Sequence, residues 1–95
     1  IYLGDVFTPD GDGNNDFFFV QTSPNIQIEI PFFRIYDRWG NLVFENQDSP
    51  ANEPSLGWDG RFEDTNAVQS VYIYSINYAI GGQAFTLIGS VTLIR

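Results

Sequence analysis

Three aspartates within seven residues form the densest group of ligand-type side chains in the sequence. Asp10, Asp12 and Asp16 fall at alternate positions with Asn14 between them, and glycines at positions 11 and 13 let the backbone curl. Oxygen ligands at i, i+2, i+4 and i+6 are how a calcium loop wraps its ion. Carboxylates this close repel by about 1 kcal/mol per pair at 4 Å in water, and a bound cation reverses that sign. The segment therefore predicts a calcium site at Asp10, Asp12, Asn14 and Asp16.

The match to a helix-loop-helix calcium loop is partial. That loop has Gly at its sixth position and Glu at its twelfth, where this chain has Asn15 and Gln21. Further ligands would have to come from backbone carbonyls, water or Asp5. The alternative is a solvated turn in which Asx side chains accept hydrogen bonds from their own backbone.

A second candidate is the segment Ile-Tyr-Asp-Arg-Trp-Gly at residues 35–40. A guanidinium beside an indole can stack on it, and Trp and Arg are enriched where protein interfaces gain most of their energy. On this interpretation Arg38, Trp39 and Gly40 anchor a partner surface. The alternative is a hairpin end with Trp39 folded over the edge of the domain.

A third segment, Gly57-Trp58-Asp59-Gly60, predicts a tight turn with one large apolar side chain. We expect Trp58 in the core or as a lid over it, rather than in a ligand site. Asp59 is expected to cap a turn or to reach the aspartate loop.

The elements that position these segments have a strand pattern almost throughout. Gly, Pro, Asn and Asp punctuate short runs of β-branched and aromatic residues, and such spacing favours a sandwich over a βαβ fold. Pro31 lies where the alternation changes parity, so a bulge, break or edge is expected there. The stretch Gln47–Gly57 is predicted to be a loop. The expected strands are Tyr2–Phe7, Phe17–Thr22, Ile26–Asp37, Leu42–Asn46, Arg61–Phe62, Val71–Ile80 and Ala84–Ile94.

The last two expected strands form a predicted hairpin around Gly81-Gly82. A two-residue loop places Ile80 opposite Gln83 and fixes the remaining register. Tyr74 then faces Gly89, an aromatic covering a strand glycine. The same register puts the pairs Tyr78 with Phe85, Ile76 with Leu87 and Tyr72 with Val91 on one apolar face, and leaves the opposite face mixed and solvated.

Composition excludes several classes of function. The 95 residues carry a net charge of −8 and contain no Cys, His or Lys. Thiolate chemistry, the usual general bases and the common zinc ligands are therefore absent. Only carboxylate pairs remain for catalysis, and a chain this short has little room for their cleft, so we predict no enzyme and no small-molecule substrate. The acidic charge disfavours nucleic acid, and no apolar stretch approaches membrane-spanning length.

Five motifs in order resemble one known family. Residues 7–13 with Asn15-Asp16 resemble its FTPNGDGxND opening, residues 35–40 its IYNRWG centre, and residues 58–60 its WDG. Residues 71–74 resemble the end of its GVYxY, with Ser70 in place of the glycine, and residues 89–95 resemble its GxVTLIR end. The family is the gliding-motility-associated C-terminal domain of Bacteroidetes, also called the type B C-terminal sorting domain.

The resemblance implies an all-β fold, an immunoglobulin-like antiparallel β-sandwich of about seven strands, with residues 1–95 as a single C-terminal domain. It implies that the domain directs a passenger protein through the periplasm and across the outer membrane by the type IX secretion system. The expected partners are the translocon and an associated outer-membrane protein, docking at Arg38, Trp39, Gly40 and the last strand ending at Arg95. The alternative is a calcium-dependent adhesion or carbohydrate-binding module.

Overall fold

Residues 1–13 and 15–95 are described by a computed structural model, and their regular structure is almost entirely β. The order of strands in the main sheet is β1-β7-β6-β2-β3, and β4 pairs with β5 in a second, two-stranded sheet. The all-β, sandwich-like prediction is confirmed. The strands are β1 (Val6–Phe7), β2 (Ile28–Tyr36), β3 (Leu42–Gln47), β4 (Arg61–Phe62), β5 (Thr65–Asn66), β6 (Ser70–Ile80) and β7 (Gln83–Leu93), with one 3-10 turn, η1 (Pro54–Leu56).

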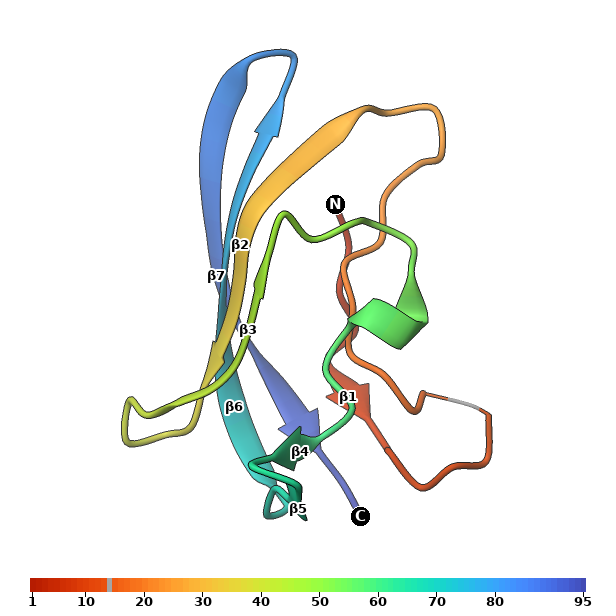
Figure 1. Cartoon of the computed structure of the whole chain (residues 1–95), viewed down its shortest axis with the longest axis vertical. Coiled ribbons are helices and arrows are strands. Elements are labelled where there is room, and N and C mark those ends of the chain that lie inside the picture. Colours follow the sequence, from red (N-terminus) through yellow and green to blue (C-terminus); the bar gives the residue numbers. More distant parts are fainter. Residues whose placement is uncertain (14) are drawn as a thin grey trace.

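The β6–β7 hairpin has the predicted register. Ile80 pairs with Gln83, and the pairing continues without a shift to Ser70 and Leu93. Gly81 and Gly82 both have positive φ, at 60° and 81°, as the two-residue turns of twisted hairpins require. Long, uninterrupted pairing makes this hairpin the framework of the sheet, and its tip extends beyond the rest of the fold (Figure 1).

Tyr74 covers Gly89 as expected. The two residues are register partners, and a Cβ atom built on Gly89 would overlap the Tyr74 hydroxyl and ring. The Tyr74 ring also lies 5.4 Å from the ring of Phe18, centroid to centroid. The glycine therefore provides the space in which the aromatic ring lies flat on the sheet and reaches the core.

Pro31 marks a bulge in β2, as its sequence position predicts. The register between β2 and β6 shifts between Glu29 and Phe32. Proline has no N–H to donate to the ladder. The extra residue of the bulge makes side chains of the other parity point to the core beyond it. Ile30, Phe33 and Ile35 are consequently all buried although their parities differ.

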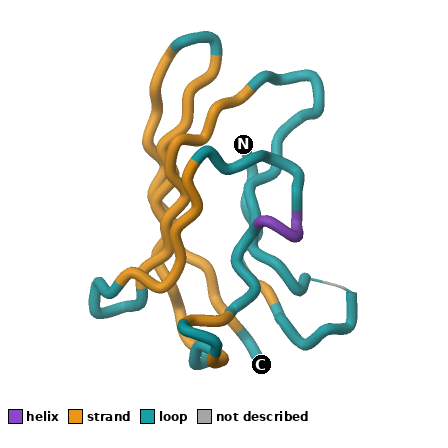
Figure 2. Tube along the Cα trace, in the orientation of Figure 1, coloured by secondary structure: helices purple, strands orange, loops and turns teal. Residues whose placement is uncertain are grey.

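The layer facing the main sheet consists mostly of irregular backbone (Figures 1 and 2). The predicted strand Phe17–Thr22 is wrong, because the segment makes only isolated bridges from Phe18 to Trp58 and from Gln21 to Tyr2. The opposing segment contains Pro50, Pro54 and η1, which cannot supply a continuous ladder.

The predicted strand Tyr2–Phe7 is too long for a related reason. Tyr2 bridges to Gln21, whereas Val6 and Phe7 pair with β7, so the chain changes partner between them. The β1–β7 pairing is parallel, which departs from the purely antiparallel expectation. Parallel neighbours need a long connection, and here almost the whole chain separates the two strands.

Aromatic side chains from both layers meet in the core. Trp58 is 1% exposed, which confirms its predicted burial, and its ring lies 5.3 Å from Phe7 and 4.9 Å from Tyr72. The Trp58 indole N–H donates to the Arg61 carbonyl at 3.0 Å. A Cβ on Gly57 would collide with the Phe18 backbone carbonyl, so only glycine fits at this position. The GWDG segment thus fixes one side of the core.

Candidate functional site

The aspartate loop brings its carboxylates together. One oxygen each from Asp10, Asp12 and Asp16 lies within 4.8 Å of the other two, and no other such cluster occurs in residues 1–13 and 15–95. Asn14, the fourth predicted ligand, lies outside the described residues. The donors are therefore carboxylate oxygens, which suit a hard divalent cation such as calcium.

Backbone amides hold the Asp16 carboxylate in place. Oδ2 accepts a hydrogen bond from the Gly13 N–H at 2.8 Å, and Oδ1 accepts one from the Gly11 N–H at 3.0 Å. These bonds favour the ionised form, so they lower the pKa of Asp16, with the Gly13 bond the largest cause. Asp10 Oδ1 accepts from the Asp12 N–H at 3.1 Å. The same contacts close the turn by themselves, as the solvated-turn alternative requires.

Asp59 belongs to its own turn. Its Oδ1 accepts from the Arg61 N–H at 3.1 Å, which is the predicted turn cap.

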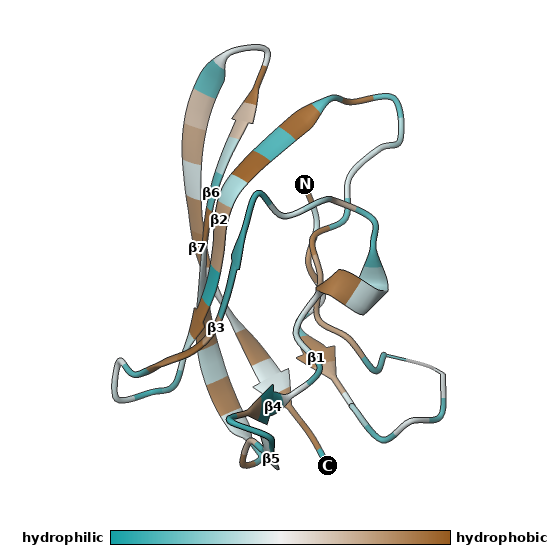
Figure 3. Ribbon diagram, viewed as in Figure 1, coloured by the Kyte–Doolittle hydropathy of each residue, from teal (hydrophilic) through white to brown (hydrophobic). Residues whose placement is uncertain are grey.

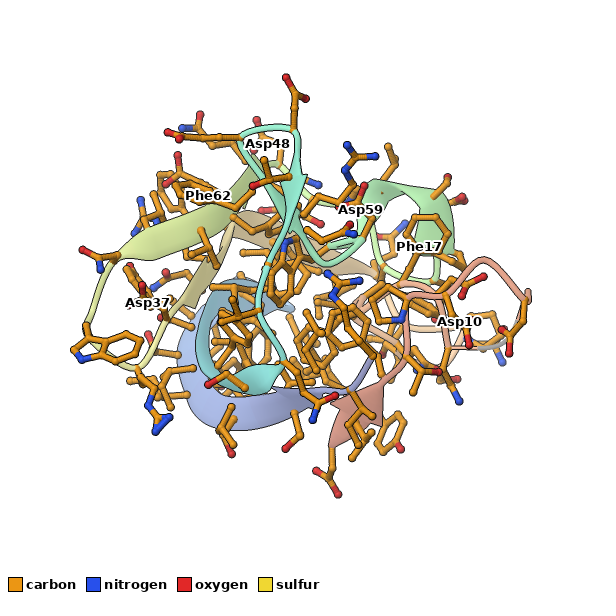
Figure 4. All side chains as sticks on the ribbon, turned by 90° about the horizontal axis from the view of Figure 1, so that it is seen from below. Asp10, Phe17, Asp37, Asp48, Asp59 and Phe62 are labelled. Atoms are coloured by element: carbon orange, nitrogen blue, oxygen red, sulfur yellow. The ribbon has the colours of Figure 1, made fainter. Side chains whose placement is uncertain are left out.

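Figure 4 shows Asp10 and Asp37 on opposite sides of the molecule, with Asp59 between them in that view. The aspartate loop and the Arg38-Trp39 turn are therefore separate candidate sites.

Asp37 organises the turn between β2 and β3. Its Oδ1 accepts from the backbone N–H groups of Trp39 and Asn41, both at 2.9 Å, and its Oδ2 accepts from the Asn41 side chain at 3.0 Å. These bonds lower the pKa of Asp37, the Asn41 side chain most of all. Gly40 has a φ of 86°, which L residues rarely adopt. The sequence alone indicated no role for Asp37, although Asp at the first position and Gly at the fourth are typical of such a turn.

The turn presents Trp39 to solvent. Its side chain is 75% exposed, so the alternative in which it folds over the edge of the domain is wrong. The Arg38 guanidinium lies 5.3 Å from the indole centroid. A large apolar ring is thus held outward on a tightly bonded turn, with a cation stacked beside it.

An apolar groove of about 590 Å3 runs beside this turn. Trp39 and Leu42 line it from the β2–β3 side, and Phe62 and Val68 line it from the segment around β4 and β5. Phe62 and Asp37 lie on the same side of the molecule in Figure 4. The sequence did not predict Phe62 and Val68 as groove residues, because no local pattern indicates that β4 and β5 lie across from the Trp39 turn.

Arg95 bonds to backbone from three distant parts of the chain. Its guanidinium donates to the carbonyls of Gly60 at 2.5 Å, Ala67 at 2.9 Å and Pro9 at 3.5 Å. Its own N–H donates to the Gln69 side chain at 2.8 Å. The predicted partner-binding role of Arg95 stays a prediction, and what the contacts show is a clamp on the end of the fold.

Among residues 1–13 and 15–95, no helix has the length and hydrophobicity needed to cross a membrane. No curated protein matches the chain. A family model described as "CHU_C Type IX secretion signal domain" matches residues 1–93, which is nearly the entire sequence. The chain therefore belongs to the CHU_C type IX secretion signal domain family.

Proposed function

We propose that this chain is a C-terminal sorting domain that directs its passenger across the outer membrane to the cell surface or medium. The supporting observation is the family match over residues 1–93. The translocon and an associated outer-membrane protein recognise the domain as a folded surface. The passenger reaches the periplasm by a separate N-terminal signal.

One recognition surface in this proposal is the Trp39 turn, made by Arg38, Trp39 and Gly40. Asp37 fixes the turn through three hydrogen bonds, so little ordering entropy is lost when a partner covers it. Exposed Trp and Arg side chains on rigid backbone are the residues that dominate binding energies. Arg95 acts indirectly, because its guanidinium donates to the carbonyl of Ala67, which lines the groove.

Export of a reporter tests the function. A periplasm-targeted fluorescent protein is fused to residues 1–95 in a host with a type IX secretion system and the cognate partner. We expect the reporter on the surface or in the medium, and its loss there in a translocon mutant. Trp39→Ala should reduce export, whereas Leu56→Ala, at an exposed apolar side chain of η1, should not. A wild-type reporter retained in the periplasm contradicts the proposal.

We also propose that calcium binds the aspartate loop through Asp10, Asp12, Asn14 and Asp16. The clustered carboxylates support this, because a cation removes their mutual repulsion. For a site with a dissociation constant of about 1 mM, 10 mM calcium stabilises the fold by about 1.4 kcal/mol, which raises the melting temperature by about 5–10 °C.

Thermal denaturation in calcium and in EDTA tests the metal. Asp12→Ala should abolish the calcium-dependent shift, and Glu53→Ala, which removes an exposed carboxylate outside the loop, should preserve it. Equal melting temperatures of the wild type in calcium and EDTA would favour the solvated turn.

The exposed Trp39 indole gives the carbohydrate-binding alternative one supporting observation, because sugars stack on such rings. Binding of the isolated chain to a glycan array, lost in Trp39→Ala, would favour that function.

A further inference from the structure

The outer edge of β7 is mostly unpaired. β7 pairs with β6 along its full length, but β1 covers it only at Thr92 and Leu93. Within the described residues, no strand lies beside the stretch from Gln83 to Val91. Figure 1 shows this part of the β6–β7 hairpin rising clear of β1 and of the facing layer.

The register identifies the backbone groups that face outward. The Thr92 N–H donates to Asp5 and the Ile94 N–H to Phe7, so these residues direct their amides toward β1. The β6–β7 ladder has no register shift, and the direction of the amides alternates along a strand. Ala84, Thr86, Ile88 and Ser90 therefore direct N–H and C=O groups toward the bare edge, which is the template for another strand.

β7 lacks the usual protection of an edge strand. Charges, prolines and bulges normally prevent edge pairing. Residues 65–94 contain no charged residue and no proline, although the chain carries 16 charges in all. Ile88, in the middle of the bare stretch, is 68% exposed. By contrast, Glu45 on the opposite edge strand β3 forms an ion pair with Arg34 at 2.6 Å. In Figure 3, β3 is hydrophobic over its first half and hydrophilic over its second half, which includes Glu45, whereas β7 is mostly neutral to hydrophobic.

The chain's own beginning does not cover this edge. Continued pairing of β1 would place residues 1–5 beside β7, but Tyr2 instead bridges to Gln21 in the other layer. Asp5 is left exposed at the lower end of the bare stretch. Burial raises the pKa of Tyr74, and the negative charge of Asp5 raises it further. Tyr74 is the register partner of Gly89, so Asp5 lies near that part of β7. A negative charge therefore lies beside the point where an added strand would end.

We propose that the bare edge of β7, Ala84–Ser90, binds a β-strand of the export machinery by strand addition. The inference rests on the proposed function. The added strand is uncharged where it pairs with this stretch, since β7 offers no charge to oppose, and it carries a cationic residue at the end that meets Asp5. A second copy is a poorer occupant, because it brings two chains of net charge −8 together.

The reporter fusion tests the edge with paired variants. Ile88→Pro removes one outward N–H that the β6–β7 ladder does not use, and Ile88→Lys adds a charge at the same place while keeping the backbone. Ile88→Thr keeps both the N–H and the strand preference. Ile73→Lys is the matched control, because Ile73 is exposed on the same sheet face but lies on β6, which has a neighbour on each side. Urea denaturation of each purified variant verifies that it folds.

We expect Ile88→Pro and Ile88→Lys to lower export about tenfold, while Ile88→Thr and Ile73→Lys export like the wild type. Asp5→Lys should also lower export. Undiminished export of a folded Ile88→Lys variant overturns the inference and leaves the proposed function standing. A wild-type reporter that is not exported overturns both. Sedimentation of the purified wild type completes the test, since a dimer that Ile88→Lys dissociates would assign the edge to a second copy and overturn the inference.

Discussion

The contact between Tyr74 and Gly89 predicts that the effect of Gly89→Ala on stability changes sign when Tyr74 is replaced. Gly89→Ala places a methyl group where the Tyr74 hydroxyl and ring now lie. The ring also packs on Phe18, so moving it away loosens the contact between the two layers. Overpacking of this kind costs about 1–3 kcal/mol. In a chain of this size each 1 kcal/mol lowers the melting temperature by about 4–8 °C.

Urea denaturation of a double-mutant cycle measures the contact. In a Tyr74→Leu background the ring atoms that meet the methyl group are gone. Gly89→Ala should then stabilise the chain by about 0.5–1 kcal/mol, the usual gain for replacing glycine inside a strand. Removal of the Tyr74 ring should therefore change the effect of Gly89→Ala from destabilising to stabilising. An equal cost of Gly89→Ala in both backgrounds would refute the reasoning and place its effect on the backbone or the denatured state.

Three further changes test other contacts. Gly57→Ala forces a Cβ into the Phe18 carbonyl and should destabilise the chain by about 2 kcal/mol or more in urea, whereas Gly4→Ala meets only an ordinary van der Waals contact and should be nearly neutral. Arg95→Lys cannot reach three carbonyls at once and should cost about 1 kcal/mol by the same assay; unchanged stability would contradict the clamp. The pKa of Asp16 in the folded chain lies below its ordinary 3.8. The ionised carboxylate therefore contributes its full stabilisation above pH 3.8, and this stabilisation is lost as the pH falls through the lowered pKa. Asp16→Asn should therefore weaken the loss of stability, measured by urea denaturation, as the pH falls below 3.8.

The main sheet was predictable where local rules fix geometry. Gly81-Gly82 determines the register of β6 and β7, and Pro31 determines the bulge in β2. The facing layer was not, because Phe17–Thr22 has the composition of a strand but its neighbours include two prolines and a 3-10 turn. Strand propensity describes a side chain that fits a pleated surface, and it does not provide the partner strand.

The candidate sites show the same division. The spacing of the aspartates predicted that their carboxylates cluster, since the ligands are neighbours in sequence. The exposure of Trp39 and its apolar groove depend on where β4 and β5 lie relative to the β2–β3 turn, which is long-range information. Arg95 illustrates the limit most clearly, because its three carbonyl partners come from segments that only the complete fold brings together.

The position of β7 between β1 and β6 also determines when the chain can fold. Val6 pairs with Thr92, so a loop of almost the full chain must close before the first strand has a partner. All-β sandwiches, which depend on such distant pairings, fold in about milliseconds to seconds, slowly for small domains. Ribosomes add about 5–20 residues per second and make β7 after the other strands of this sheet. A nascent chain that stops short of β7 leaves both β1 and the outer side of β6 unpaired, so the complete five-stranded sheet forms only after residue 93 has been made.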